Sequence, residues 1–420
     1  MIDIFNNKHS EILKSLMWRS LQIGSKYGIL LLIFILAAKY LSPYDFGVYN
    51  YLLAVAFFLI IIGDFGISFA ASRYVAEYDS LDREKMKLVF FNSFILIFFI
   101  SLILILFVLL FGKFLFGSEV YNLLIYLLPL SFIGPMTSLY DGLYRGLKKF
   151  RELAIFSLVP AVISLVISFF LIIKYGLVGA LLSQIVFYSL LFLFLSFGYK
   201  HYSFDFNKTI LSKIASYSLV IGVASLGYYF YTQFDLVILG KFGYIEEIGM
   251  YEIVNKLLLF TIIPFSIFAH VISPDITKKW TEKKTNFIIS KFKKYLLLAV
   301  IFSFISVVSL YFLFPLLLKL FLPHYFNPLM IRIFNLMLFV YFTQISTSII
   351  SVGFVYPTGY AKLSMYFLII FGLLNVILDL VLVNFFGFIG VIYSTVILKI
   401  VADILFTLVY YTKLKKIKYM

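Results

Sequence analysis

The sequence predicts an all-α integral membrane protein: twelve transmembrane helices in two six-helix bundles, forming a parallel pseudo-twofold repeat around a central cavity. The composition, the spacing of the apolar runs and an internal repeat all indicate this fold class. Of the 420 residues, 63% are hydrophobic and only 13% are charged, and the mean hydropathy is +1.04. Soluble domains are roughly 45–50% apolar, so this chain has too much apolar side chain to be surrounded by water.

The apolar runs have the length that crosses a bilayer, which takes roughly 20 residues in a helix. They predict spans at residues 20–40, 48–72, 88–111, 120–142, 154–173, 177–197, 215–239, 248–272, 295–316, 328–350, 362–383 and 388–411. Because the number of spans is even, both ends of the chain are expected on the same side of the membrane.

The Lys and Arg residues between the predicted spans fall almost entirely on one side. The other side carries only Lys39, Lys113, Lys174, Lys241 and Lys319. Cytoplasmic loops are enriched in Lys and Arg, so the alternation predicts a multi-pass protein of the cell membrane with both termini in the cytoplasm. The same bias accounts for the net charge of +15, which therefore does not indicate a nucleic-acid partner.

Two stretches of the first half recur in the second half. LAAKYLSPYDFGVYNYLL matches VILGKFGYIEEIGMYEIV, and KYGLVGALLSQ matches NFFGFIGVIYST. The matched positions are Lys39 with Lys241, Gly47 with Gly249, Tyr49 with Tyr251, Gly176 with Gly387 and Gly179 with Gly390. The first stretch precedes the second span of a six-helix unit, and the second stretch precedes the sixth span. Because each unit has an even number of spans, the two halves share one orientation. This predicts an N-terminal lobe at 1–205 and a C-terminal lobe at 206–420, with substrate bound between them.

Charged side chains inside the predicted spans are the candidate functional residues, because an unpaired charge in hydrocarbon costs several kcal/mol. We expect a substrate-binding group that lines the cavity: Lys26, Asp64, Lys256 and Arg332. A second group is assigned to ion coupling or to pairing between helices: Asp235, Glu252, Asp379, Lys399 and Asp403.

Spacing and depth predict partners for several of these charges. Lys26 and Asp64 lie at about the same depth, so they are expected to pair. Glu252 and Lys256 are four residues apart with the acid first, which is the favourable order on a helix. Lys399 and Asp403 have the same spacing in the last span. The alternative for every pair is a buried tie between helices without a role in transport.

The sequence also excludes several kinds of site. There is no cysteine, so disulfides and thiolate metal centres are absent, and the four histidines are too scattered for a metal site. No phosphate-binding glycine loop is present, and no connection is long enough for a catalytic domain. We therefore expect no enzyme, no cofactor and no structural metal, while coupling to a proton or a sodium ion stays open.

The segment AAKYLSPYDFGVYNYLLAVAFFLIIIGDFGISFAASRYVAEY resembles the N-terminal signature of the polysaccharide flippases, in the multidrug/oligosaccharidyl-lipid/polysaccharide exporter superfamily. QFDLVILGKFGYIEEIGMYEIVNKL resembles their seventh and eighth helices, and HVISPDITK resembles the end of the eighth. The resemblance implies a two-lobed flippase that moves a polyprenyl-diphosphate-linked oligosaccharide from the cytoplasmic to the outer leaflet by alternating access. It also implies a cavity lined by helices one, two, seven and eight, and the glycan-assembly enzymes as further candidate partners.

Two other functions remain open at this point. An ion-coupled multidrug or metabolite antiporter of the same superfamily has the same architecture, and the mixed charges inside the spans do not distinguish it. An integral-membrane polysaccharide polymerase or sugar transferase is the third alternative. The short connections disfavour it, because such enzymes carry a sizeable loop with Arg, His or Asp.

Overall fold

We analysed a computed structural model, which describes residues 2–418. Within these residues, eleven helical stretches are long and apolar enough to cross a membrane. One of them, α7 (Phe150–Gly198), crosses twice, because Gly176 leaves helical geometry at φ +54° and ψ −128° and reverses the chain. The predicted all-α fold class with twelve spans is confirmed.

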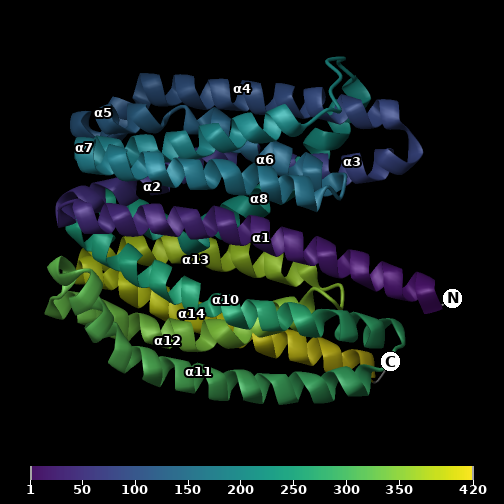
Figure 1. Cartoon of the computed structure of the whole chain (residues 1–420). Helices are drawn as coiled ribbons and strands as arrows, with labels where there is room; N and C mark the ends of the chain where they lie inside the picture. The colour runs from purple at the N-terminus through teal and green to yellow at the C-terminus, as the bar shows by residue number, and fades with distance from the viewer. Residues whose placement is uncertain (1, 419–420) are drawn as a thin grey trace. The chain divides into compact units, whose positions relative to one another are not determined.

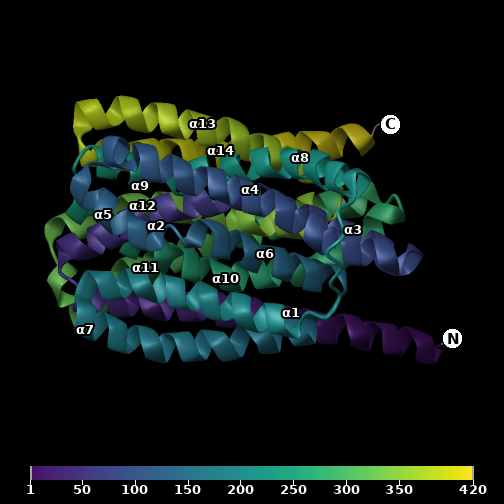
Figure 2. The ribbon, with the colours of Figure 1, turned by 90° about the horizontal axis from the view of Figure 1, so that it is seen from above.

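The first compact unit is Met1–Leu226. Besides α7 it holds α1 (Ile2–Tyr40), α2 (Pro43–Asp64), α3 (Ile67–Leu81), α4 (Arg83–Phe116), α5 (Ser118–Leu127) and α6 (Leu130–Gly146). Within this unit α1 packs along α7, and α6 packs against α2, α3 and α7 (Figures 1 and 2).

The second compact unit is Gly227–Met420. It holds α9 (Phe234–Lys241), α10 (Ile245–Thr281), α11 (Thr285–Phe321), α12 (Pro328–Ile350), α13 (Ala361–Phe386) and α14 (Phe388–Lys418), with short helices η1 (Pro323–Tyr325) and η2 (Ser351–Val355). Within it α14 packs against α12 and α13. The two units divide inside α8 (Lys208–Thr232). The lobe boundary expected between residues 205 and 206 stays a prediction, as do the pseudo-twofold relation and the central cavity.

Local sequence explains where several helices begin. Ser42 and Pro43 start α2: the Ser42 hydroxyl accepts a hydrogen bond from the Asp45 amide at 3.1 Å, and proline suits the first helical position. Asp82 accepts from the Lys85 amide at 3.2 Å in the same way at the start of α4. Each of these side chains satisfies a backbone donor that the first turn of a helix leaves unpaired.

Three spans that the apolar runs predicted as continuous helices are interrupted. The second span breaks between α2 and α3, where Phe65 and Gly66 have φ +36° and +80°. The fourth breaks at Pro129, between α5 and α6, and the seventh at Gln233, between α8 and α9. Hydropathy averages over a whole span, so it does not reveal where a helix is interrupted.

The internal repeat recurs in backbone and side-chain detail. Gly176 and Gly387 have φ +54° and +60°, a conformation that favours glycine. Shortly after each, a Cβ on Gly179 or Gly390 would collide with a carbonyl oxygen of the preceding helix. The matched tyrosines are both buried and make equivalent contacts. Gln184 donates to the Tyr49 hydroxyl at 2.6 Å, and the Tyr251 hydroxyl lies 3.4 Å from the Thr395 hydroxyl. Each unit thus builds the same connection between its second and sixth spans.

Candidate functional site

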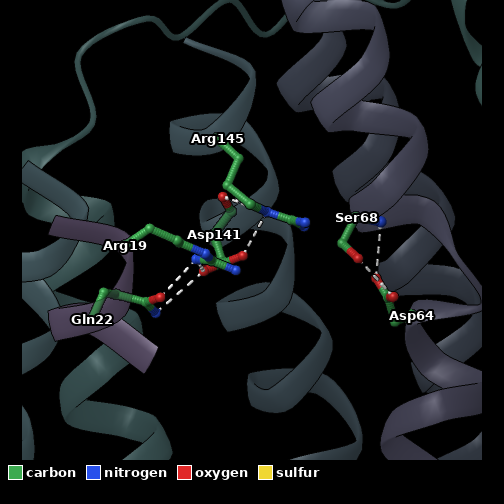
Figure 3. Close-up of polar contacts among 6 residues, drawn as sticks. All are labelled: Arg19, Gln22, Asp64, Ser68, Asp141 and Arg145. Carbon is green, nitrogen blue, oxygen red and sulfur yellow. Dashed lines mark hydrogen bonds and ion pairs between the residues drawn. The ribbon is translucent and has the colours of Figure 1, made fainter. Parts of the chain in front are cut away.

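The first unit contains a group of charged side chains centred on Asp141, on α6. The two oxygens of this carboxylate accept from Arg19 Nη1 at 2.9 Å and from Arg145 Nε at 2.7 Å. Gln22 completes the group, because its Oε1 accepts from Arg19 at 2.6 Å and its Nε2 lies 3.3 Å from Asp141 (Figure 3). Two guanidinium groups therefore share one carboxylate, and we call these four residues the arginine cluster.

The arginine cluster is partly open to its surroundings. The side chains of Arg19, Asp141 and Arg145 are 27%, 18% and 22% exposed. Arg19 uses only Nη1 in these contacts, and the Arg145 guanidinium lies over the Phe69 ring at 5.0 Å. An arginine has five N–H donors in a planar fork that fits carboxylate or phosphate, so both side chains keep donors for a further anion.

Lys26 and Asp64 do not form the predicted ion pair. The Lys26 ammonium lies over the rings of Tyr188 and Tyr27, at 5.7 and 6.0 Å. Asp64 accepts instead from the amide and hydroxyl of Ser68, at 3.0 and 2.8 Å (Figure 3). The break between α2 and α3 explains this outcome, because Asp64 satisfies a free amide in the first turn of α3.

Both residues nevertheless lie within electrostatic reach of the arginine cluster. Lys26 interacts with the charges of Asp141 and Arg19, and Asp64 interacts with Arg145. The combined group holds three cations and two carboxylates, so it carries one net positive charge when all five are ionised.

In the second unit, Glu252 and Lys256 form the predicted pair on one face of α10. Their charged atoms are 3.1 Å apart, with Glu252 buried and the Lys256 side chain 32% exposed. Arg332 is exposed near the start of α12 and donates from Nη2 to the Tyr393 hydroxyl at 3.2 Å. The position of these residues relative to a cavity stays a prediction.

The second unit also buries three carboxylates, which we call the acidic cluster: Asp235, Asp379 and Asp403, exposed by 3%, 0% and 7%. Asp235 Oδ2 accepts from the Tyr251 hydroxyl at 2.5 Å, and Asp379 Oδ2 accepts from Asn375 Nδ2 at 2.9 Å. Asp235 and Asp379 interact with each other electrostatically, and each of the three with Lys399. The sequence assigned all three carboxylates and Lys399 to ion coupling or pairing without relating them, and the fold places them together.

Several buried oxygens of this region lack a hydrogen-bond partner among the described residues: Asp235 Oδ1, Asn375 Oδ1, Asp379 Oδ1 and Asp403 Oδ2. Buried polar atoms in folded proteins are nearly always paired. Among the side chains that the structure describes, no three or more His, Asp or Glu are arranged to hold a metal ion.

The acidic cluster has no counterpart in the first unit. In the register that pairs Gly176 with Gly387, Ser164 and Ser168 stand where Asn375 and Asp379 stand. The two units thus share a backbone plan but differ in chemistry, with the arginine cluster in one and the acidic cluster in the other.

Sequence reasoning missed the arginine cluster. The charge bias of the cytoplasmic connections accounts for Arg19 and Arg145, and Asp141 falls at the edge of the predicted span 120–142. The signal was present, because Asp141 and Arg145 have the same acid-first, four-residue spacing as Glu252 and Lys256. The contact with Arg19 joins residues 122 positions apart, and no local pattern predicts it.

The sequence profile of the polysaccharide biosynthesis protein family matches residues 12–280. No curated protein matches the chain in sequence. Among solved structures, the chain is similar to an inward-facing multidrug resistance MATE family transporter of the MOP superfamily, with TM-score 0.80, 17% identity and 96% of both chains covered. It is also similar to the lipid II flippase MurJ in an inward closed conformation, with TM-score 0.77, 18% identity, and 94% of this chain and 87% of that one covered.

A third similar structure is a MOP superfamily transporter from Pyrococcus furiosus whose binding pocket is described as reversed in polarity. Its TM-score is 0.63 at 16% identity, with 97% of this chain and 96% of that one covered. The family profile spans well over half of the sequence, and these structures share its fold. The chain therefore belongs to the polysaccharide biosynthesis protein family, within the multidrug/oligosaccharidyl-lipid/polysaccharide exporter superfamily of membrane transporters and flippases.

Proposed function

We propose that this protein is a flippase that moves a polyprenyl-diphosphate-linked oligosaccharide from the cytoplasmic to the outer leaflet of the cell membrane by alternating access. The product would supply the assembly of a surface polysaccharide or glycan. The observation that carries the proposal is the arginine cluster with its net positive surroundings. A diphosphate is too costly to move bare through hydrocarbon, so its carrier must supply fixed positive charge, and Arg19 and Arg145 supply it at the ends of two spans.

The cluster supports a specific role for each residue. Asp141 holds the guanidinium groups of Arg19 and Arg145 in place when no substrate is bound. Phosphate oxygens would take the N–H donors that remain free, and bidentate contacts with arginine are strong. Lys26 adds a further charge on the same helix as Arg19.

Reconstituted vesicles test the assignment. We expect Arg19→Gln, Arg145→Gln and Lys26→Ala each to reduce flipping of a fluorescent polyprenyl-diphosphate sugar by about tenfold or more, since each removes a positive charge that would contact the diphosphate. Arg83→Gln is the matched control, because Arg83 is exposed at the start of α4. Undiminished flipping by all three variants would exclude the cluster as the anion site.

We further propose that the acidic cluster couples transport to a monovalent cation, either a proton or Na⁺. The unpaired oxygens of Asp235, Asn375 and Asp379 support this proposal, as oxygen atoms are the ligands that hard cations prefer. These residues would hold the cation and Thr395 would lie beside it, while burial keeps water away. Buried acids inside membrane proteins commonly mark proton or ion pathways.

Ion gradients test the coupling. We expect wild-type flipping to rise when a Na⁺ or proton gradient is imposed, and Asp379→Asn to flip at a rate that no longer responds to that gradient. A rate in wild-type vesicles that is independent of both gradients would contradict the coupling and leave the flippase assignment standing.

A cation-coupled antiporter is the second candidate function. The net negative charge buried in the second unit favours it, as does the likeness to MATE transporters. Uptake of a cationic dye, measured in the same vesicles as glycolipid flipping, separates the two functions.

A further inference from the structure

Lys399 is a buried ammonium group among carboxylates that it does not contact. It lies on α14 and is only 6% exposed. Asp235, Asp379 and Asp403 all interact with its charge. Yet among the side chains that the structure describes, Lys399 has no ion-pair partner within 4.0 Å. Its Nζ lies over the Tyr231 ring, 5.8 Å from the ring centre.

The carboxylates around Lys399 fall into two groups by their neighbours. Asp235 and Asp379 lie on α9 and α13, and each has one oxygen without a partner. Asp403 lies one turn along α14 from Lys399, beside Thr343 and Thr347 of α12, and it also keeps a free oxygen. A lysine side chain is a point charge on a flexible four-carbon stem, so Lys399 can turn toward either group.

Electrostatics makes these two positions alternatives. An ammonium group buried without a partner is strongly unfavourable, so Lys399 must be stabilised by one group or the other. A free cation between Asp235 and Asp379 would repel Lys399, and Asp403 then offers the nearer negative charge. With the free cation gone, two carboxylates would attract Lys399 back.

We propose that Lys399 is a tethered cation that competes with the free coupling cation for Asp235 and Asp379 and turns to Asp403 when that cation binds. The proposal rests on the coupling site proposed above and adds a regulatory residue to it. When the free cation binds, the Lys399 ammonium moves toward Asp403 and its α12 neighbours. In this way α14 responds to cation binding.

Cation-dependent stability tests this without any transport measurement. The midpoint of thermal unfolding in detergent is measured over a range of NaCl at constant ionic strength, with N-methylglucamine chloride as replacement, and then over a range of pH. We expect Lys399→Gln to tighten the apparent affinity for the stabilising cation by about tenfold or more, because the competitor is gone. Lys399→Met, which is apolar and of similar length, provides a second neutral side chain. Lys399→Arg retains the positive charge, so it should still compete with the free cation.

Lys319→Gln is the matched control, because Lys319 on α11 is exposed and lies over the Phe326 ring at 4.6 Å, and the cation affinity of this variant should equal that of the wild type. If Asp379→Asn abolishes cation stabilisation but Lys399→Gln and Lys399→Met leave the affinity unchanged, the tethered-cation role is wrong and the coupling site stands. If neither cation stabilises the wild type or the Lys399 variants, both proposals fall.

Discussion

At the scale of single residues, the charges inside the membrane were predictable but their partners were not. The sequence pointed to Lys26 and Asp64 by their cost in hydrocarbon, and depth suggested that they pair. In the structure, Asp64 accepts a hydrogen bond from Ser68, and the Lys26 ammonium lies over an aromatic ring. Of the two pairs predicted within one helix, Glu252 and Lys256 form an ion pair, whereas Lys399 and Asp403, which have the base first, do not come within 4.0 Å. Helical spacing permits such a contact, and tertiary packing decides whether it forms.

The pair in α10 gives an asymmetric prediction. Removing the Lys256 side chain leaves the Glu252 carboxylate buried and unpaired. Removing the Glu252 side chain leaves an ammonium group that can extend out of the protein, since a third of the Lys256 side chain is exposed. We expect Lys256→Ala to lower the thermal unfolding midpoint more than Glu252→Ala. The exchange of the two charges should be tolerated better than Lys256→Ala. Equal losses in all three variants would show that the residues make independent contacts.

Asp141 gives a second prediction at this scale. Asp141→Asn should destabilise the protein by about 1–3 kcal/mol, because two guanidinium groups lose their shared charged acceptor. Chemical or thermal unfolding in detergent measures the change. Glu84→Gln, which breaks an exposed pair with Lys87, is the control and should change stability by less than about 1 kcal/mol. Similar effects in both variants would mean that the arginine cluster adds nothing to stability.

At the scale of helices, close backbone approaches position the first-unit site. A Cβ on Gly142 of α6 would overlap the carbonyl oxygen of Ser68 on α3, so only glycine permits this contact. Asp141, which precedes Gly142, is the centre of the arginine cluster, and Ser68 donates a hydrogen bond to Asp64. The contact therefore sets the distance between the two halves of the candidate site.

A pair of glycine substitutions tests that packing. Gly142→Ala should cost about 1–3 kcal/mol of stability through overpacking, and it should also reduce flipping. Gly24→Ala on α1 is the matched control, because no atom lies within 4 Å of its added Cβ, so it should be neutral or stabilise the helix by up to about 1 kcal/mol. A harmless Gly142→Ala would show that α3 and α6 can separate without loss.

The connection between α7 and α8 gives a prediction for pH. Partial burial, followed by the Lys149 ammonium 3.4 Å away, lowers the pKa of His201 below its ordinary value of 6.5. The folded state then binds fewer protons than the unfolded state. Its stability is full above the ordinary pKa and declines as the pH falls through it.

Acidification from about pH 7.5 to about pH 5.5 should therefore lower the unfolding midpoint of the wild type. In His201→Gln this part of the decline should be absent. Identical slopes against pH in the two proteins would remove His201 as its cause.

At the scale of the whole molecule, hydropathy and charge alternation predicted the fold class and all twelve spans, because bilayer thickness fixes helix length. The repeat was also visible, and glycine pairs such as Gly176 and Gly387 adopt the same backbone conformation. The breaks at Gly66 and Gln233 and the arginine and acidic clusters were not predictable, since they depend on contacts between helices distant in sequence.

The absence of natural cysteine makes the predicted topology directly testable. We expect Lys284→Cys, in the connection after α10, to react with an impermeant thiol reagent only after intact cells are permeabilised. Ser118→Cys, at the start of α5, should react from outside, as Ser118 is exposed. The reverse pattern would place both termini outside the cytoplasm.

The central claim is that the protein flips a diphosphate-linked glycolipid through its arginine cluster. The most direct measurement is the appearance of a fluorescent polyprenyl-diphosphate oligosaccharide in the opposite leaflet of reconstituted vesicles, detected with a membrane-impermeant quencher. The account predicts flipping by the wild type and by Arg83→Gln, with a loss of about tenfold or more in Arg19→Gln and Arg145→Gln. Vesicles that transport a cationic dye but leave the glycolipid in its original leaflet would contradict it.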